Sequence, residues 1–386
     1  MPERIAGIRW TPFRIPFAQE FSIGSAPGAP LKAREGLIVE LQSDRGARGL
    51  GEASPLPERG EGSAPAAADL LREFGPLLVG ADWGSARERL GALPDRPGRQ
   101  AVRCALDVAQ LDLTGRAAGL PVAAQLVREY GGRTAAAVPV NATIGSHAPE
   151  DVRTAGARAR AAGYSAVKLK VGVADTLEAE RLRVAAAREA LGPAVRLRLD
   201  ANGAWTVPEA IAMLSALETY DLEWVEQPVA DVAGLAAVRR ESRVRIAADE
   251  SVGGAAAARA LLRAGAADLL VLKPMSLGGL RPAAGIARLA RRAGAAAVVT
   301  TTIDTGIGAA AALQLAATLP APAPACGLAT ASLLAVDLLR RPLPVEAGVM
   351  RLPAAPGLGV HLDRDLLARY RSGAVGECGE LRAAAP

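Results

Sequence analysis

Lysine is scarce in this chain and stands where chemistry would need an amine. Only four of the 45 basic residues are lysine: Lys32, Lys168, Lys170 and Lys273. Arginine stays protonated in proteins, whereas lysine can lose its proton when it is desolvated or lies near another positive charge. Three of the four lysines lie inside apolar runs typical of β-strands, VKLKV (167–171) and LLVLKP (269–274). We interpret these three as members of a proton-transfer site, the alternative being chance survival on a solvated face.

Three acidic residues end successive predicted strands. They are Asp200 in LDANG, Glu226 in VEQP and Asp249 in ADES. Neighbouring strands lie about 4.7–4.9 Å apart, so these carboxylates should converge and repel one another unless a cation joins them. An all-oxygen set favours Mg²⁺, with Mn²⁺ as second choice, and two histidines without clustered cysteines argue against zinc. The alternative is that each acid caps a helix or pairs with a base beyond its strand.

The lysines suggest how such a site would move a proton. Lys168 and Lys170 are two residues apart and point to the same face of their strand, so each ammonium lowers the pKa of the other. Lys170, nearer the strand end, is the candidate general base. Lys273 comes from the sixth predicted strand and should face the second strand across a barrel. Two amines would then flank a small-molecule carboxylate, which fits proton abstraction next to that group through an enediolate.

Other polar residues are candidates for supporting roles. Asn202 and Asn141, the only two asparagines, each lie at a predicted strand end. Asn202 should orient the metal shell or the substrate, although a simple loop turn explains it nearly as well. Glu250 should contact Lys170 or one of the metal ligands without binding the metal itself.

Two residues near the start of the chain are candidates for substrate contact. Phe21 begins the Gly/Pro loop FSIGSAPGAP (21–30) and is the candidate lid residue. Phe13 and Phe17 are expected instead to alternate into the core of the first domain. Arg34 is a candidate partner for a second carboxylate of the substrate.

The pattern along the chain predicts a barrel with an attached domain. Residues 1–130 combine alternating strands with helical stretches, and residues 131–335 alternate short apolar strands with Ala/Arg/Leu-rich helices. Residues 336–386 are expected to return to the first domain, after a helix over ASLLAVDLLRR (331–341). Eight strands are expected, at 137–144, 165–172, 195–202, 222–228, 244–251, 268–274, 296–302 and 324–330. A doubly wound open sheet is the rival, but polar residues at nearly every strand end favour a barrel.

Composition restricts the partners and the compartment. The net charge is +5, but basic and acidic residues are interspersed, so nucleic acid is not expected as a partner. No long uncharged apolar run suggests a membrane segment, and no apolar N-terminal region suggests a signal peptide. The three cysteines form no CxxC pair and no even-numbered disulfide framework, which favours the reducing cytoplasm as the compartment. Assembly into a homo-oligomer stays open.

Several motifs in order resemble the enolase superfamily, in its muconate-lactonising subgroup. They are KLKVG (168–172), LDANGAW (199–205), EWVEQP (223–228), ADES (248–251) and KPMSLGG (273–279). The resemblance implies an α/β fold, a modified TIM barrel (β/α)₇β with an α+β capping domain built from the N-terminal region and the C-terminal segment. It also implies Mg²⁺ on Asp200, Glu226 and Asp249, with Lys170 and Lys273 as acid–base residues.

Within the subgroup, the chain is most similar to the o-succinylbenzoate synthases, which dehydrate a cyclohexadiene carboxylate on the menaquinone pathway. GEASPLP (51–57), TTTIDTGIG (300–308) and CGLATASLLAVDLL (326–339) carry this similarity, and Thr301 and Ile303 become further candidates for substrate contact. The eighth strand, ACGLAT, lacks the Asp-x-Asp of dipeptide epimerases. The alternatives are an N-succinylamino acid racemase, a dipeptide epimerase or cycloisomerase, and, in another class, a non-catalytic ligand-binding barrel.

Overall fold

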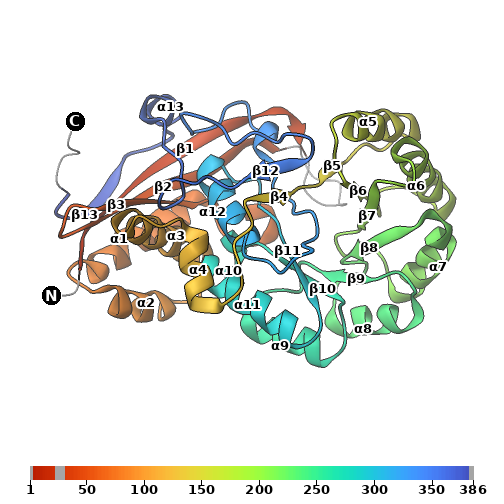
Figure 1. Cartoon of the computed structure of the whole chain (residues 1–386), viewed down its shortest axis with the longest axis horizontal. Helices are drawn as coiled ribbons and strands as arrows, with labels where there is room; N and C mark the ends of the chain where they lie inside the picture. Colours follow the sequence, from red (N-terminus) through yellow and green to blue (C-terminus); the bar gives the residue numbers. More distant parts are fainter. Residues whose placement is uncertain (1–2, 22–30, 382–386) are drawn as a thin grey trace.

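A four-stranded antiparallel sheet forms the first layer of the molecule (Figure 1). The computed structural model describes residues 3–21 and 31–381. The sheet has the order β13-β1-β2-β3, with bounds Gly376–Gly379 (β13), Ile5–Phe21 (β1), Leu31–Ser43 (β2) and Arg48–Ala53 (β3). Phe13 and Phe17 are buried from β1, which confirms that they alternate into this core.

Helices α1 (Ala64–Leu78) and α3 (Arg99–Ala118) pack on this sheet. The same part of the chain forms η1 (Pro57–Arg59) and two further helices, α2 (Trp83–Gly91) and α4 (Val122–Tyr130), which both pack against α3. The central helix α3 packs on β3, where Gly49 and Gly51 bring the two backbones together. A Cβ on Gly51 would lie 1.9 Å from the carbonyl oxygen of Ala105, so no larger residue fits without moving the helix.

Seven parallel strands form the second body, in the order β11-β10-β9-β8-β7-β6-β5. Their bounds are Ala142–Ile144 (β5), Ala166–Lys170 (β6), Arg196–Asp200 (β7), Leu222–Glu226 (β8), Ile246–Ala248 (β9), Leu269–Leu272 (β10) and Ala296–Val299 (β11). Helices follow the strands: α5 (Pro149–Ala161), α6 (Leu177–Leu191), α7 (Val207–Leu217) with η2 (Glu218–Tyr220), α8 (Val232–Glu241), α9 (Ala255–Arg263), α10 (Pro274–Leu277), α11 (Leu280–Arg292) and α12 (Gly306–Ala316). The strand–helix alternation expected from the sequence is confirmed.

The eighth strand position is filled by a short segment around Cys326 that closes the sheet. Its backbone forms single parallel bridges, Val140 with Cys326 on one side and Thr300 with Gly327 on the other. The amide of Cys326 donates to Pro139 O at 2.8 Å, and that of Gly327 donates to Val299 O at 2.9 Å. The fold is therefore the expected modified TIM barrel with a separate capping sheet.

The first expected strand is split in two. Residues 137–144 form β4 (Ala137–Pro139) and β5, and only β5 joins the parallel sheet. The other part, β4, pairs with the antiparallel strand β12 (Val349–Arg351) instead. The chain therefore pairs first with β12, through β4, and joins the parallel sheet only at β5.

The helix expected over residues 331–341 is wrong. Only the 3₁₀ turn η3 (Ala331–Leu333) forms, and residues 334–341 then follow an irregular path with isolated bridges. Leu334 bridges Phe17, and Leu339 bridges Leu362, so tertiary packing overrides the helical spacing of the leucines. After α13 (Arg364–Arg369), β13 pairs antiparallel with β1, beside the start of the chain (Figure 1).

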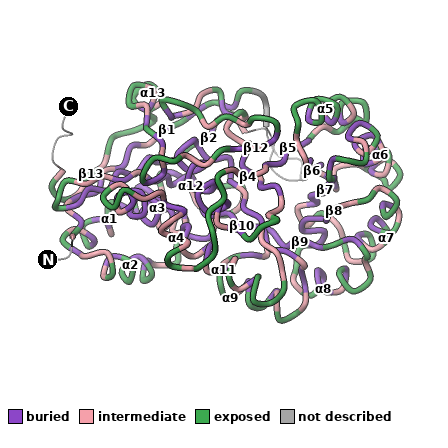
Figure 2. Tube along the Cα trace, in the orientation of Figure 1, coloured by how far each residue is buried: buried purple, intermediate pink, exposed green. Residues whose placement is uncertain are grey.

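Helix α12 lies between the capping sheet and the barrel, and every one of its residues is buried (Figure 2). It contacts β3 and α4 on one side and β11 on the other. An apolar helix of this kind needs burial on all sides. Across the ranges that the structure describes, no helix combines the length and apolarity needed to cross a membrane.

Replacing Gly51 by alanine should lower the free energy of unfolding by about 2–3 kcal/mol, because the new methyl group overlaps the backbone of α3. Gly145→Ala is the matched control, since a Cβ at Gly145 meets nothing within 4 Å. Urea unfolding of both variants measures the difference. Equal stability of the two variants would show that β3 and α3 are not in close backbone contact.

Candidate active site

A row of charged side chains crosses three adjacent strands at the carboxyl end of the barrel. Lys170 on β6 is in register with Asp200 on β7, and Asp200 is in register with Glu226 on β8. Asp249 follows β9, and Lys273 follows β10. Parallel strands end at one rim, so five functional groups predicted from separate segments meet in one place.

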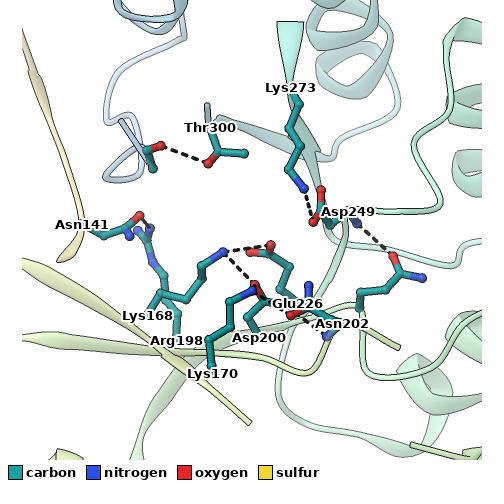
Figure 3. Close-up of polar contacts among 12 residues, drawn as sticks. Asn141, Lys168, Lys170, Arg198, Asp200, Asn202, Glu226, Asp249, Lys273 and Thr300 are labelled. Atoms are coloured by element: carbon teal, nitrogen blue, oxygen red, sulfur yellow. Dashed lines mark hydrogen bonds and ion pairs between the residues drawn. The ribbon is translucent and has the colours of Figure 1, made fainter. Parts of the chain in front are cut away.

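The amines contact the carboxylates directly (Figure 3). Lys168 Nζ donates to Asp200 Oδ2 at 2.8 Å and to Glu226 Oε1 at 3.1 Å, and Lys170 Nζ donates to Asp200 Oδ2 at 2.6 Å. Lys273 Nζ donates to Asp249 Oδ2. Figure 3 shows Lys168 and Lys170 reaching the acids from one side and Lys273 from the other.

Burial and neighbouring charge act differently on the two lysines of β6. Burial lowers the pKa of Lys168, but attraction by Asp200 and Glu226 outweighs it and raises the pKa above the ordinary value. Burial also lowers the pKa of Lys170, where the charge of Lys168 adds to burial and attraction by Asp200 does not compensate. Lys170 is therefore the amine of this pair that loses its proton more readily.

The three acids form a buried cluster of negative charge. Asp200, Glu226 and Asp249 are 0, 3 and 5 % exposed. Burial, followed by repulsion from Asp200, raises the pKa of Glu226 to about 8. In residues 3–21 and 31–381 no three such side chains already form a metal cage, because these acids turn to the lysines. Their chemistry still fits a hard divalent cation, since all three side chains offer carboxylate oxygens as donors.

Asn202 connects Lys170 to a further ion pair. Its Oδ1 accepts from Lys170 Nζ at 2.7 Å, and its Nδ2 donates to Glu250 Oε1 at 2.9 Å. The φ of Asn202 is 46°, a left-handed conformation that asparagine tolerates. Glu250 thus acts on Lys170 through Asn202, and no direct contact between them is found in the described part of the chain.

Arg59, from η1 of the capping domain, completes this network and was missed in the sequence. Its guanidinium lies 3.2 Å from Glu250 Oε1 and 3.7 Å from Asp249 Oδ2. The two acids lie 190 residues or more further along the chain, so no local pattern marked Arg59. The capping domain therefore contributes a cation to the barrel's acidic rim.

A second layer lies below the reactive row and was also missed. Arg198, 1 % exposed, stacks on Trp224 at 3.8 Å from the ring centroid. Its Nη1 donates to Asn141 Oδ1 at 3.1 Å and to Ala325 O at 2.6 Å. Asn141, expected beside the substrate, contacts this arginine, which ties the first strand region to the closing segment.

The remaining candidates are Thr301 and Ile303, in the loop after β11, and Arg34 and Phe21, from the capping sheet. Thr301 Oγ1 lies 2.7 Å from Thr330 Oγ1, and Ile303 has a φ of 63°. Arg34 is buried and donates to the carbonyl oxygens of Ile303 at 3.0 Å, of Pro55 at 2.8 Å and of Ser54. Its expected role as a partner of the substrate finds no support, because these carbonyls engage all three nitrogens. The side chain of Phe21 and the lid over residues 22–30 lie outside the described residues.

A pocket of about 670 Å³ opens beside Lys273 and Asp249. The capping domain supplies Glu58, Arg59 and Glu61 to its wall, and the barrel supplies Asn202, Glu250 and Ser276 among others. Glu61 also holds the wall together, because it accepts from Ser276 Oγ at 2.5 Å and from Leu56 N at 3.1 Å. The size suits a small molecule.

A buried acidic pair fixes the β11 loop to the capping sheet. Glu52 accepts from Thr305 N at 3.0 Å and from Gly308 N at 2.9 Å. Asp304 accepts from Thr302 Oγ1 at 2.6 Å. Burial, followed by repulsion from Glu52, raises the pKa of Asp304 to about 7.

Comparisons with known proteins show the family of the chain. The family model for enolase C-terminal domain-like proteins matches residues 150–366. The chain is 44% identical over 214 residues to the o-succinylbenzoate synthase of Thermobifida fusca (strain YX). That match covers 55% of this chain and 66% of the relative, just under two thirds of its length.

Two further matches cover most of the chain. A chloromuconate cycloisomerase of Cupriavidus pinatubonensis is 30% identical over 345 residues, 88% of this chain and 92% of that protein. The structure of the dipeptide epimerase from Enterococcus faecalis V583, complexed with Mg and the dipeptide L-Leu-L-Tyr, has a TM-score of 0.84 and 28% identity. This match covers 92% of this chain and 99% of the epimerase chain.

Asp304→Asn should change how stability depends on pH. The folded protein keeps the Asp304 proton up to about pH 7, whereas the unfolded chain releases it near 3.8, so the wild type loses stability as the pH rises between these values. The variant lacks this proton. Relative to the wild type, its free energy of unfolding should therefore rise by about 2–3 kcal/mol between roughly pH 5 and pH 8. Urea unfolding at several pH values tests this, and a constant difference would contradict the raised pKa.

Proposed function

The chain belongs to the enolase C-terminal domain-like family, and within this family we propose that it is an o-succinylbenzoate synthase. The resemblance to the muconate-lactonising subgroup of the enolase superfamily is confirmed by the matches. The proposed reaction is the syn-dehydration of 2-succinyl-6-hydroxy-2,4-cyclohexadiene-1-carboxylate. The observation that carries the proposal is the approach of Lys170 and Lys273 to one carboxylate cluster from different sides.

Asp200, Glu226 and Asp249 would hold the cation, which we propose to be Mg²⁺. When bound, the ion would draw charge from the substrate carboxylate and so make the neighbouring C–H more acidic. Lys168 bridges Asp200 and Glu226 and keeps both acids at the rim. The E. faecalis epimerase complexed with Mg supports this choice of metal.

Lys170 is the proposed base. Its neutral form is favoured by burial and by the charge of Lys168, and Asn202 orients its amine. It takes the proton next to the substrate carboxylate, and Lys273 stays protonated to stabilise the enediolate. In a syn-elimination the hydroxyl departs from the face that lost the proton. The ammonium of Lys170 can then return that proton as water leaves.

The sequence of the eighth strand favours the dehydratase over a dipeptide epimerase. ACGLAT has no acid to hold a substrate ammonium, and Ala325 and Cys326 there are fully buried. A racemase of N-acylated amino acids is the second candidate, because it would use the same two lysines, one per face. Solvent deuterium separates the two: a racemase exchanges the α-proton of either enantiomer, whereas the dehydratase releases an aromatic product with ultraviolet absorbance.

Lys170→Met should lower kcat for the dehydration by about 10²–10⁴-fold, because the base is lost while the other contacts remain. Lys32→Met is the matched control: Lys32 is exposed and is the one lysine outside the site, so full activity is expected. The rate of formation of the aromatic product from the cyclohexadiene precursor measures both. Unchanged turnover by Lys170→Met would contradict its role as the base and favour a non-catalytic barrel.

Mg²⁺ should raise the midpoint of thermal unfolding by about 3–5 °C, because a ligand of the folded state alone stabilises it by mass action. Glu226→Gln should remove most of this shift, because a neutral amide replaces a carboxylate ligand. Glu218→Gln, at an exposed acid paired with Arg243, should keep it. A wild type indifferent to Mg²⁺ would rule out the metal at these three acids.

A further inference from the structure

A second pocket, of about 550 Å³, lies between the capping domain and the barrel. Its wall is built by α2, α3 and α4 on one side and by α9 and α11 on the other, helices that lie together in Figure 1. Arginine is about one residue in nine of the chain but six of the fifteen residues lining this pocket. They are Arg87, Arg103, Arg259, Arg281, Arg288 and Arg292. The enrichment exceeds what the arginine-rich composition alone explains.

Two carboxylates line the same pocket, and both are already paired. Arg281 Nη1 lies 2.6 Å from Asp107 Oδ1, and its Nε lies 3.2 Å from Glu129 Oε2. Arg87 lies 3.8 Å from Glu129 Oε1. The acids in the wall therefore neutralise at most two of the six guanidinium groups.

Four arginines of the pocket form no salt bridge within the described residues. Arg259 on α9 and Arg288 and Arg292 on α11, all three exposed, form no ion pair there. Arg103, which is partly buried, donates to the amide oxygen of Gln100 at 3.2 Å, and its charge is attracted by Asp107, which Arg281 already holds. Cations gathered without counter-charges repel one another, so an anion in this pocket would relieve the repulsion.

We propose that this pocket is a binding site for an anion that carries a diphosphate group. Guanidinium forks from opposite walls suit the several oxygens of adjacent phosphates, and four unpaired arginines match a ligand with more than one negative charge. The volume lies within the range of small-molecule sites. The site is separate from the carboxylate cluster and does not depend on the reaction proposed there.

One structural element joins the two pockets. Helix α10 follows Lys273 directly. Ser276 and Leu277 from this helix line the catalytic pocket, and the next residue, Gly278, lines the arginine pocket. An anion bound among the arginines therefore lies beside the segment that positions Lys273.

Calorimetric titration with inorganic pyrophosphate, in magnesium-free and phosphate-free buffer, tests the proposal. The double variant Arg259→Ala/Arg292→Ala removes one unpaired guanidinium from each of α9 and α11. Arg263→Ala/Arg291→Ala is the matched control, with two exposed arginines of the same helices outside the pocket lining. We expect the first pair to weaken binding at least about tenfold, because charge-assisted hydrogen bonds are lost, and the control to stay within about twofold.

Parallel titrations identify the ligand. Similar affinities for pyrophosphate and ADP would assign recognition to the diphosphate, and tighter binding of ADP would add a nucleoside to the ligand. Absence of pyrophosphate binding, or equal loss in the two double variants, would overturn the proposal. Displacement of pyrophosphate by a lower concentration of a glutamate-rich peptide would overturn it as well, because the surface would then dock acidic protein segments. Without added anion both double variants should keep wild-type catalytic activity.

Discussion

Three carboxylates buried side by side are the constraint on which the catalytic end of this molecule depends. Asp200, Glu226 and Asp249 are almost inaccessible to solvent, and burial penalises each negative charge. The lysines of β6 and β10 supply opposite charge from the barrel, and Arg59 supplies it from the capping domain. Removing any one partner would leave a buried charge uncompensated, so the two domains are electrostatically tied at this rim.

The barrel positions this cluster through strand register rather than through loops. Lys170, Asp200 and Glu226 lie in one row across β6, β7 and β8, and the buried side chains of these strands fix their register. Two residues below, Arg198 holds Asn141 and the closing segment at Ala325. The reactive row therefore rests on a buried polar layer that also completes the barrel.

Residues at strand ends could be predicted from the sequence because the carboxyl ends of parallel strands share one rim. This argument brought Lys170, Asp200 and Lys273 together, and the alternation of strands and helices gave the fold. Arg59 could not be predicted, since one arginine among many has no local signal when its partners are distant in the chain. The leucines of residues 331–341 suggested a helix, but their packing against Phe17 and Leu362 decides the conformation.

The scarcity of lysine has a practical consequence for chemical work on the protein. Among the lysine side chains, an acylating reagent finds one exposed, Lys32, whereas those of Lys168, Lys170 and Lys273 are only 15, 23 and 10 % exposed. Slow acylation beyond the first site would therefore report on the opening of the barrel mouth. The same distribution leaves Lys32 as the exposed lysine side chain through which the protein can be coupled to a surface.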